Sequence, residues 1–358
     1  MSICKETFGR LQDGQSVDRY TLINGNGCKA SLITFGAALQ ELWMPDRQGQ
    51  LADVVLGYPD MVGYSSAGNP RHGAVIGRVA NRVSNGRFIL NGQVIELSKN
   101  KAPNHMHGGF VSFDKKVWAA EIVDNGDEPA VRFVTVSPDG EEGYPGTCTT
   151  ALTYTLTRDN ALRLDYEAFA DKDTAINLTN HAYFNLQGHD QGNILNHVVR
   201  LAADDFTVID SNCYPTGEIR PVAGTALDFT TAKPIGQDID RDEEQIQFAN
   251  GYDHNFVLRG DLSRAGEKLL KACAFVVEPD SGRTMTVETT SPGVQFFTPK
   301  KMRPGEPGKG GIHYDDRCSF CLETQYFPDA LNHPNFPSPI FCVGETYRHT
   351  TIYRFGVK

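Results

Sequence analysis

A row of polar residues within one short segment is the part of the sequence that most clearly points to chemistry. Residues 177–186 read Asn-Leu-Thr-Asn-His-Ala-Tyr-Phe-Asn-Leu. Five hydrogen-bonding groups in line suit a ligand covered in hydroxyl groups, namely a sugar, and a histidine among them can exchange a proton near neutral pH. An ordinary half-exposed strand with an isolated histidine would show the same pattern of residues. Because side chains alternate between the two faces of an extended strand, one face would carry Asn177, Thr179, His181, Tyr183 and Asn185.

Five further blocks gather polar residues of the kinds that bind ligands or transfer protons. Residues 104–109, for example, combine His105 and His107 with two glycines that permit close approach of the backbone. Taken singly, each block also has a structural explanation, because arginines pair with surface carboxylates, histidines fill cores and an aspartate can hold a turn. The five blocks are residues 77–82, 104–109, 251–256, 292–297 and 322–337.

Together with residues 177–186, these blocks resemble the aldose 1-epimerases, or galactose mutarotases, in which they occur in the same order. The resemblance implies an all-β fold, a single large antiparallel β-sandwich with an open sugar-binding cleft, formed by residues 1–358 as one domain. It also implies an isomerase of carbohydrate metabolism that interconverts the α and β anomers of free hexoses such as galactose and glucose.

The resemblance assigns roles to individual residues. Glu323 is similar to the general base that takes the proton of the anomeric hydroxyl, and His181 to the general acid that protonates the ring oxygen. Opening a hemiacetal needs both transfers, and a positioned acid and base each contribute about 10²–10⁴-fold. The substrate-binding positions implied by the resemblance are Asn81, Arg82, His107, Tyr183, Asp253 and Gln295.

The ordinary pKa values of the two groups set an expectation for pH dependence. A working pair needs Glu323 ionised and His181 protonated, and values of about 4.3 and about 6.5 leave an active window between them. We expect nearby carboxylates, from Glu323 and Asp253, to favour the imidazolium form of His181 and so extend this window upward.

No cofactor and no metal are expected, since ring opening involves no redox change, phosphate transfer or carbanion. Cys318 and Cys321 have C-x-x-C spacing, but on a strand they would point to opposite faces, and no second cysteine pair lies nearby. His105 and His107 have the i, i+2 spacing of strand metal ligands but lack a third ligand.

Two other functions stay open. A related epimerase acting on hexose 6-phosphates would display extra basic residues, which Lys300, Lys301 and Arg303 supply. A sugar-binding homologue without catalysis would not need both His181 and Glu323. After Phe297 the family commonly has a short Gly-Asn stretch, whereas this chain has a flexible Gly/Pro-rich loop over residues 299–311, which leaves the preferred sugar open.

The composition limits which classes of binding partner and which cellular compartment we expect. The chain has 358 residues with 34 Lys and Arg against 44 Asp and Glu, a formal charge of −10, which makes it a poor candidate for binding nucleic acid. It has no apolar signal region at the N-terminus and no apolar stretch that approaches a membrane span. Its 8 scattered cysteines are unlike a secreted disulfide framework. We therefore expect a cytoplasmic protein, a monomer or a weak homodimer, with no membrane partner.

The elements that must position these groups are almost all strands. Residues 88–90 and 94–97 flank Asn91-Gly92, which predicts a tight hairpin, and residues 149–157 should pair with residues 161–169. Helical periodicity is limited to residues 242–249 and 264–271. With 35 Gly and 19 Pro to form turns, the pattern is typical of a large sandwich or barrel. The other predicted strands are residues 30–35, 39–44, 131–136, 272–277, 284–289, 319–326 and 352–355.

Overall fold

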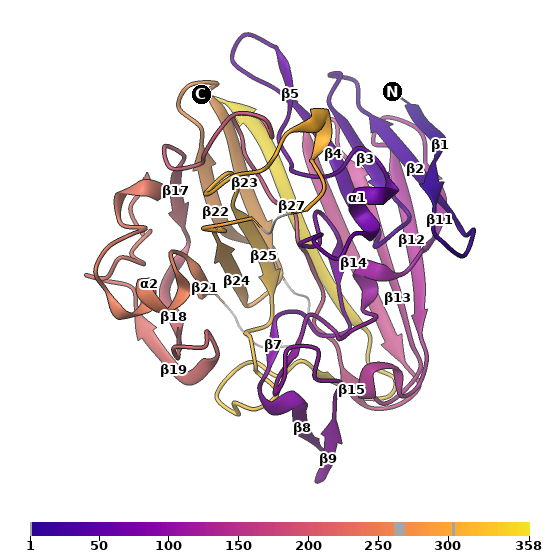
Figure 1. The fold of residues 1–358 in the computed structure, drawn as a ribbon, viewed down its shortest axis with the longest axis vertical. Coiled ribbons are helices and arrows are strands. Elements are labelled where there is room, and N and C mark those ends of the chain that lie inside the picture. Colours follow the sequence, from indigo (N-terminus) through magenta and orange to yellow (C-terminus); the bar gives the residue numbers. More distant parts are fainter. Residues whose placement is uncertain (1, 261–268, 303–304) are drawn as a thin grey trace.

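The computed structural model describes residues 2–260, 269–302 and 305–358. Strands dominate this part of the chain, and they form three larger antiparallel sheets and several two-stranded ones (Figure 1). The predicted all-β class is therefore confirmed. That residues 1–358 form one domain, and that the sugar site is an open cleft, stay predictions.

The largest sheet has nine strands and runs through the middle of the molecule (Figure 1). Its strands pair antiparallel throughout. In spatial order they are β11 (Ala119–Asp124), β12 (Ala130–Ser137), β13 (Cys148–Leu156), β14 (Ala161–Ala170), β27 (Tyr347–Val357), β23 (Arg283–Thr289), β22 (Lys271–Val277), β17 (Val198–Leu201) and β20 (Lys233–Pro234).

Two five-stranded sheets accompany it. The first contains, in order, β1 (Ser2–Arg10), β2 (Ser16–Ile23), β3 (Lys29–Ile33), β4 (Ala38–Pro45) and β5 (Leu51–Asp53). The second, which we call the site sheet, contains β19 (Pro215–Pro221), β18 (Ala203–Ile209), β21 (Asp253–Leu258), β24 (Gly293–Phe297) and β25 (Cys321–Gln325).

The remaining elements are short. Four strand pairs are β6 (Val75–Ile76) with β16 (Thr179–Asn180), β7 (Arg82–Val83) with β10 (His105–Met106), β8 (Arg87–Leu90) with β9 (Gln93–Glu96), and β15 (Thr174–Ala175) with β26 (Ile340–Phe341). The α-helices of the described residues are α1 (Met61–Ser65) and α2 (Glu244–Ala249).

Local sequence signals correctly predicted two hairpins, β8–β9 and β13–β14, and one helix. β8 and β9 pair across Asn91 and Gly92, both with positive φ, and β13 pairs with β14 as predicted. The helix predicted over residues 242–249 is confirmed as α2. Of the helix predicted over residues 264–271, residues 264–268 lie outside the described residues, and Lys271 begins β22. No local pattern predicted β1, because its side chains are mostly exposed and follow no apolar alternation.

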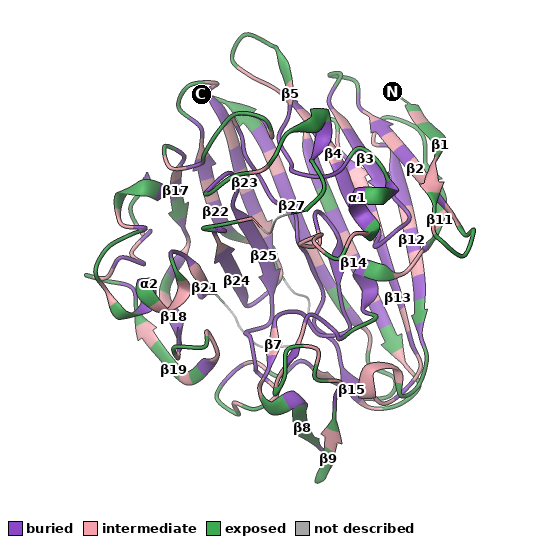
Figure 2. Ribbon diagram, viewed as in Figure 1, coloured by how far each residue is buried: buried purple, intermediate pink, exposed green. Residues whose placement is uncertain are grey.

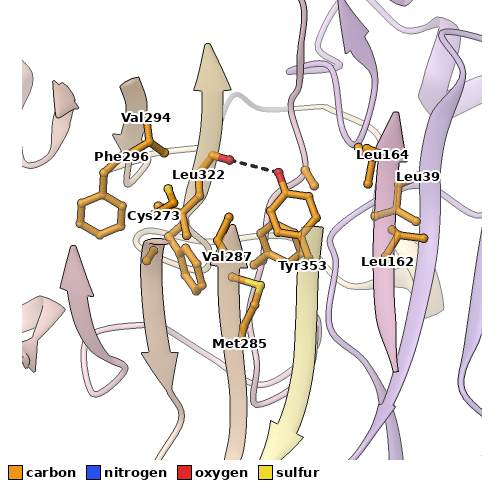
Figure 3. Packing of buried hydrophobic residues seen from close by; sticks show 14 of the residues in the cluster. Leu39, Leu162, Leu164, Cys273, Met285, Val287, Val294, Phe296, Leu322 and Tyr353 are labelled. Atoms are coloured by element: carbon orange, nitrogen blue, oxygen red, sulfur yellow. Dashed lines mark hydrogen bonds between the residues drawn. The ribbon is translucent and has the colours of Figure 1, made fainter. Parts of the chain in front are cut away.

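The core lies between the nine-stranded sheet and its neighbours, and Figure 2 shows buried residues concentrated along the central strands, while the β8–β9 hairpin projects into solvent. Figure 3 shows how the site sheet packs against this core: Val294, Phe296 and Leu322 lie in one buried cluster with Met285 and Tyr353 of the central sheet. The Tyr353 hydroxyl donates a hydrogen bond to the carbonyl of Leu322 at 3.1 Å.

This packing decides which side chains of β24 and β25 remain for chemistry. Because the strand period is two, the residues that alternate with Val294, Phe296 and Leu322 point away from the core. Gln295 and Glu323 are among them. No helix in the described part of the chain is long and apolar enough to span a bilayer.

Candidate active site

Three strands of the site sheet bring the predicted polar residues to one face. The register pairs Asn255 of β21 with Gln295 of β24, and Gln295 with Glu323 of β25. One row further along, Asp253 pairs with Phe297, and Phe297 with Cys321. Strand pairing thus makes residues that are 24 to 70 positions apart in the sequence neighbours on a single surface.

His181 faces Glu323 across this surface. Its Nε2 lies 3.6 Å from Oε1 of Glu323, and its Nδ1 lies 3.7 Å from Sγ of Cys321. The His181 backbone is fixed on both sides, because its N–H donates to the Ala74 carbonyl at 2.9 Å and its carbonyl accepts from Gly73 N–H at 3.0 Å. The imidazole stacks on Tyr183 with ring centres 4.9 Å apart. The predicted acid and base therefore lie side by side.

The interpretation of residues 177–186 as one strand with a polar face for the ligand is wrong. Only Thr179–Asn180 forms a strand, β16, and all residues of the segment are buried. The Asn177 side chain bonds the backbone of Tyr326, and Asn185 Nδ2 donates to the Cys318 carbonyl at 3.1 Å. These amides form hydrogen bonds with buried backbone groups, as polar side chains in a protein interior usually do.

Arg82, Asp253 and Gln295 form a connected network beside the pair. Arg82 Nη2 donates to Asp253 Oδ2 at 2.8 Å, and Gln295 Nε2 donates to Asp253 Oδ1 at 2.6 Å. Arg82 Nη1 also donates to Asn81 Oδ1 at 2.8 Å. Although burial opposes ionisation, the charge of Arg82 and the hydrogen bond from Gln295 hold the pKa of Asp253 below its ordinary value. Asp253 is thus held as a carboxylate.

Asn81 and His107 hold each other in left-handed backbone conformations, with φ of 62° and 51°. His107 N–H donates to the Asn81 carbonyl at 2.8 Å, and Asn81 N–H donates to Nδ1 of His107 at 3.2 Å. The following Gly108 is required, because a Cβ there would lie 1.8 Å from the Gly77 carbonyl oxygen. Since Nδ1 accepts a hydrogen bond, a neutral His107 carries its proton on Nε2. Burial, followed by the charge of Arg71, lowers the pKa of His107 well below 6.5, so the ring is neutral.

Tyr183 supports the site through its ring. Its hydroxyl donates to the Pro70 carbonyl at 3.1 Å, while the ring packs between His181 and His72. Phe297 closes the same aromatic group, with ring centres 6.3 Å from Tyr183 and 6.4 Å from His181. These contacts fix the plane of the His181 imidazole.

Burial shifts the pKa of His181 in the direction opposite to our expectation, and it also moves the pKa of Glu323 away from its ordinary value. Burial, with the charge of Asp253 as a smaller cause, raises the pKa of Glu323 from 4.5 to about 8. Burial, followed by the charge of Arg71, lowers the pKa of His181 from 6.5 to about 3. The expected gain from neighbouring carboxylates is too small to offset the loss of hydration. Between pH about 3 and about 8 the pair together holds one proton, which rests on Glu323 in the free protein.

Arg71 is a neighbour of the site that the sequence analysis missed. Its charge lowers the pKa values of His181, His107 and Glu323, and it is the largest charge effect on both histidines. Arg71 has a left-handed φ of 72°, and its Nε lies 3.4 Å from Oδ2 of Asp114. The only signal in the sequence is its place two residues before Gly73, and nothing in the sequence reveals that this backbone pairs with His181.

Of the residues considered as metal ligands, His105 forms its contacts outside the site. His105 Nδ1 lies 2.7 Å from the Ser98 carbonyl, and its Nε2 lies 2.8 Å from the Tyr144 hydroxyl. Cys318 and Cys321 are free thiols packed in one small buried cluster, and Cys318 precedes β25, so the two cysteines do not share a strand. Across the described residues, no group of three or more His, Cys, Asp or Glu is placed to hold a metal ion.

The loop over residues 299–311 is anchored rather than freely flexible at its C-terminal end. The Lys309 ammonium is buried, bonds the Asp53 carboxylate, and donates to the carbonyls of Gln40 and Val55, each at 2.8 Å. Lys300 donates to Asn250 Oδ1 at 3.0 Å, and Arg303 lies outside the described residues.

Comparisons with known proteins agree with this arrangement. The sequence profile of the aldose 1-epimerase family matches residues 18–354. Galactose mutarotase of Mus musculus is 41% identical over 357 residues, covering 100% of this chain and 99% of the mouse protein. Aldose 1-epimerase of Escherichia coli strain K12 is 35% identical over 360 residues, covering 98% of each. The solved structure of a GalM/aldose epimerase homologue from C. elegans superposes with a TM-score of 0.82 at 28% identity, covering 94% of this chain and 98% of that one. These matches confirm the resemblance, and the chain belongs to the aldose 1-epimerase family.

Proposed function

We propose that this protein is an aldose 1-epimerase that interconverts the α and β anomers of free hexoses such as galactose and glucose. The observation that carries the proposal is the position of His181 Nε2, 3.6 Å from Glu323 Oε1. Buried groups that can hold sugar hydroxyls adjoin this pair, and their types match the needs of a neutral polyhydroxy ligand. Full-length relatives named for this activity support the substrate class.

In the proposed reaction, Glu323 accepts the O1 proton while His181 donates its Nε2 proton to the ring oxygen. The C1–O5 bond breaks, its electron pair goes to O5, and C1 becomes an aldehyde. Rotation about C1–C2 and reclosure, with both protons returned, gives the other anomer. The reaction needs Glu323 ionised and His181 protonated, which has the same total charge as the resting state.

The surrounding residues bind and orient the sugar. Arg82 and the Nε2–H of neutral His107 are donors, and the Asp253 carboxylate is an acceptor fixed by Arg82 and Gln295. Asn81 keeps Arg82 in place, and Tyr183 keeps the His181 ring in its plane. These donors and this acceptor, beside the pair, would hold hydroxyls that do not react.

The proposal also includes a cytoplasmic location and a monomer or weak homodimer. All eight cysteines are free thiols in the described residues, in keeping with a reducing compartment.

Polarimetry on freshly dissolved α-glucose, α-galactose and a hexose 6-phosphate tests the function. We expect the two free sugars to reach anomeric equilibrium faster with the protein than in buffer alone. Acceleration confined to the sugar phosphate would instead make the protein a hexose-6-phosphate epimerase. Equal rates with and without the protein, combined with sugar binding measured by calorimetry, would make it a binding protein.

A further inference from the structure

Two side chains of β25 face the two nitrogens of the His181 imidazole. Sγ of Cys321 lies 3.7 Å from Nδ1, and Oε1 of Glu323 lies 3.6 Å from Nε2. Because Cys321 and Glu323 are two residues apart on one strand, their side chains leave the same face of the site sheet. A single strand therefore contacts both nitrogens of the proposed acid.

Aromatic neighbours hold the His181 ring in this orientation. The ring stacks on Tyr183 with an angle of 20° between the two planes, and the rings of His107 and Phe297 meet it edge-on, with centres 5.4 Å and 6.4 Å away. The His181 side chain is buried, so the space around the ring is occupied by protein. Each nitrogen therefore keeps its own neighbour, the thiol for Nδ1 and the carboxyl group for Nε2.

Cys321 remains a protonated thiol at neutral pH. Its side chain is buried, and burial, followed by the charges of Glu323 and Asp253, raises the pKa of the thiol well above its ordinary value. A thiol has a weak donor in its S–H and a weak acceptor in its sulfur. It can therefore form a hydrogen bond with either tautomer of neutral His181, and the group that faces the other nitrogen decides which tautomer is useful.

Glu323 makes this decision, because the proton of the resting pair lies on its carboxyl group. That proton can pass from Oε1 to Nε2 only if Nε2 does not already carry one, so the useful neutral tautomer has its proton on Nδ1. A buried Nδ1–H needs an acceptor, and the sulfur of Cys321 is the neighbour that the geometry provides. The same acceptor serves the imidazolium form, in which both nitrogens carry a proton.

We propose that Cys321 is a positioning residue that accepts a hydrogen bond from Nδ1–H of His181, so that only Nε2 exchanges protons. This role rests on the proposed function. Before the sugar reacts, the O–H bond of Glu323 breaks and its proton forms an N–H bond at Nε2, which leaves a carboxylate and an imidazolium. Glu323 then takes the O1 proton while Nε2 gives its proton to O5, and this restores the resting state. The proton on Nδ1 stays in place throughout.

Substitution of Cys321 in the full chain tests this role by kinetics. Cys321→Ala removes the acceptor, so the tautomer with its proton on Nε2 gains population at the expense of the useful one. We expect kcat to fall about three- to tenfold, the effect of losing one hydrogen bond. KM should change less than about twofold, because Cys321 binds no part of the sugar in the proposed reaction. Cys321→Ser, which keeps an acceptor at this position, should recover most of the lost rate.

Cys318→Ala is the matched control. Cys318 is a buried free thiol in the same small cluster, and its Sγ contacts Oγ of Ser319 at 3.8 Å instead of His181. The control should lower stability about as much as Cys321→Ala and leave kcat unchanged. A normal kcat in folded Cys321→Ala, or an equal fall in both alanine variants, would overturn the proposal. All these variants retain the other titratable groups that act on His181, namely His72, His107, Arg71, Asp253 and Glu323.

NMR of protein labelled with nitrogen-15 in its histidines tests the tautomer independently of any activity. At pH 6, where the His181 ring is neutral, we expect its Nδ1 to carry the proton and its Nε2 to be unprotonated. The signals of His181 are identified by their loss in His181→Asn, and in Cys321→Ala they should shift towards the tautomer with its proton on Nε2. The expected tautomer in a protein that polarimetry shows to be inactive would refute the proposed function alone. The Nε2–H tautomer in an active epimerase would overturn the role of Cys321 alone.

Discussion

Replacing Glu323 with glutamine should make the protein more stable at alkaline pH while removing its proposed base. Burial raises the pKa of this carboxyl to about 8, against 4.5 for an exposed glutamate. A folded-state pKa above the unfolded one means that the group stabilises the fold below pH 4.5, and that this stability is lost as the pH rises through about 8. Glutamine does not ionise, so the free energy of unfolding of the variant does not fall for this reason as the pH rises.

The size of the effect follows from the two pKa values. For each pH unit between 4.5 and about 8, the ionisation of Glu323 lowers the free energy of unfolding by about 1.4 kcal/mol. The total loss over this range is about 5 kcal/mol. About 4 kcal/mol of this falls between pH 5 and pH 9. A domain of ordinary stability has only about 5–15 kcal/mol, which makes the predicted change a large part of the total.

Urea unfolding of the unmodified protein and of Glu323→Gln at pH 5 and pH 9 measures this quantity. The free energy of unfolding of the variant, minus that of the unmodified protein, should be about 4 kcal/mol larger at pH 9 than at pH 5. His181 contributes with the opposite sign between pH about 3 and 6.5, but it is present in both proteins and cancels. Glu218→Gln, at an exposed carboxylate paired with Arg220, should show a constant gap.

Parallel stability curves for the unmodified protein and Glu323→Gln would refute the reasoning. They would mean that Glu323 is already ionised in the folded protein at pH 5. The resting proton of the pair could then not lie on Glu323, and our account of the resting state would fail.

Four further predictions concern activity. Glu323→Gln and His181→Asn should each lower kcat at least about a hundredfold with the fold retained by circular dichroism, and near-normal turnover in either would remove that residue from its role. Asp253→Ala should chiefly raise KM and discriminate poorly between sugars that differ at the hydroxyl it contacts, whereas a defect confined to kcat would make it catalytic. Arg71→Met should move both limbs of the pH profile upward, because the Arg71 charge lowers the pKa values of His181 and Glu323, and a stationary profile would contradict this. Dialysis against EDTA should leave the interconversion rate unchanged, and a loss restored by zinc would argue for a metal site.

Much of the fold was predictable because strand alternation and turn residues are local properties. The hairpin at Asn91-Gly92 and the pairing of β13 with β14 needed no tertiary information. The convergence of Asp253, Gln295 and Glu323 was accessible only through the family resemblance, because which strands pair is a non-local property. β1 could not be predicted from its sequence, because an edge strand with exposed side chains shows no alternation of apolar and polar residues.

The errors share one physical cause, which is burial that local sequence does not reveal. Asn177 and Asn185 were taken as ligand groups because their types suit a sugar, yet they bond buried backbone. The same burial reversed the expected protonation of His181 and Glu323.

The site is assembled from parts of the chain that are far apart, and this has a consequence for folding. Arg82 and Asp253 are 171 residues apart, and His181 and Cys321 are 140 residues apart. Contacts of such separation form late, after the loop-closure entropy of the intervening chain has been overcome. No contiguous fragment can hold the acid, the base and the Arg82–Asp253 pair unless it spans most of the chain. Recovery of activity on refolding is therefore a kinetic marker of the last long-range contacts, and it should lag behind signals from local hairpins such as β8–β9.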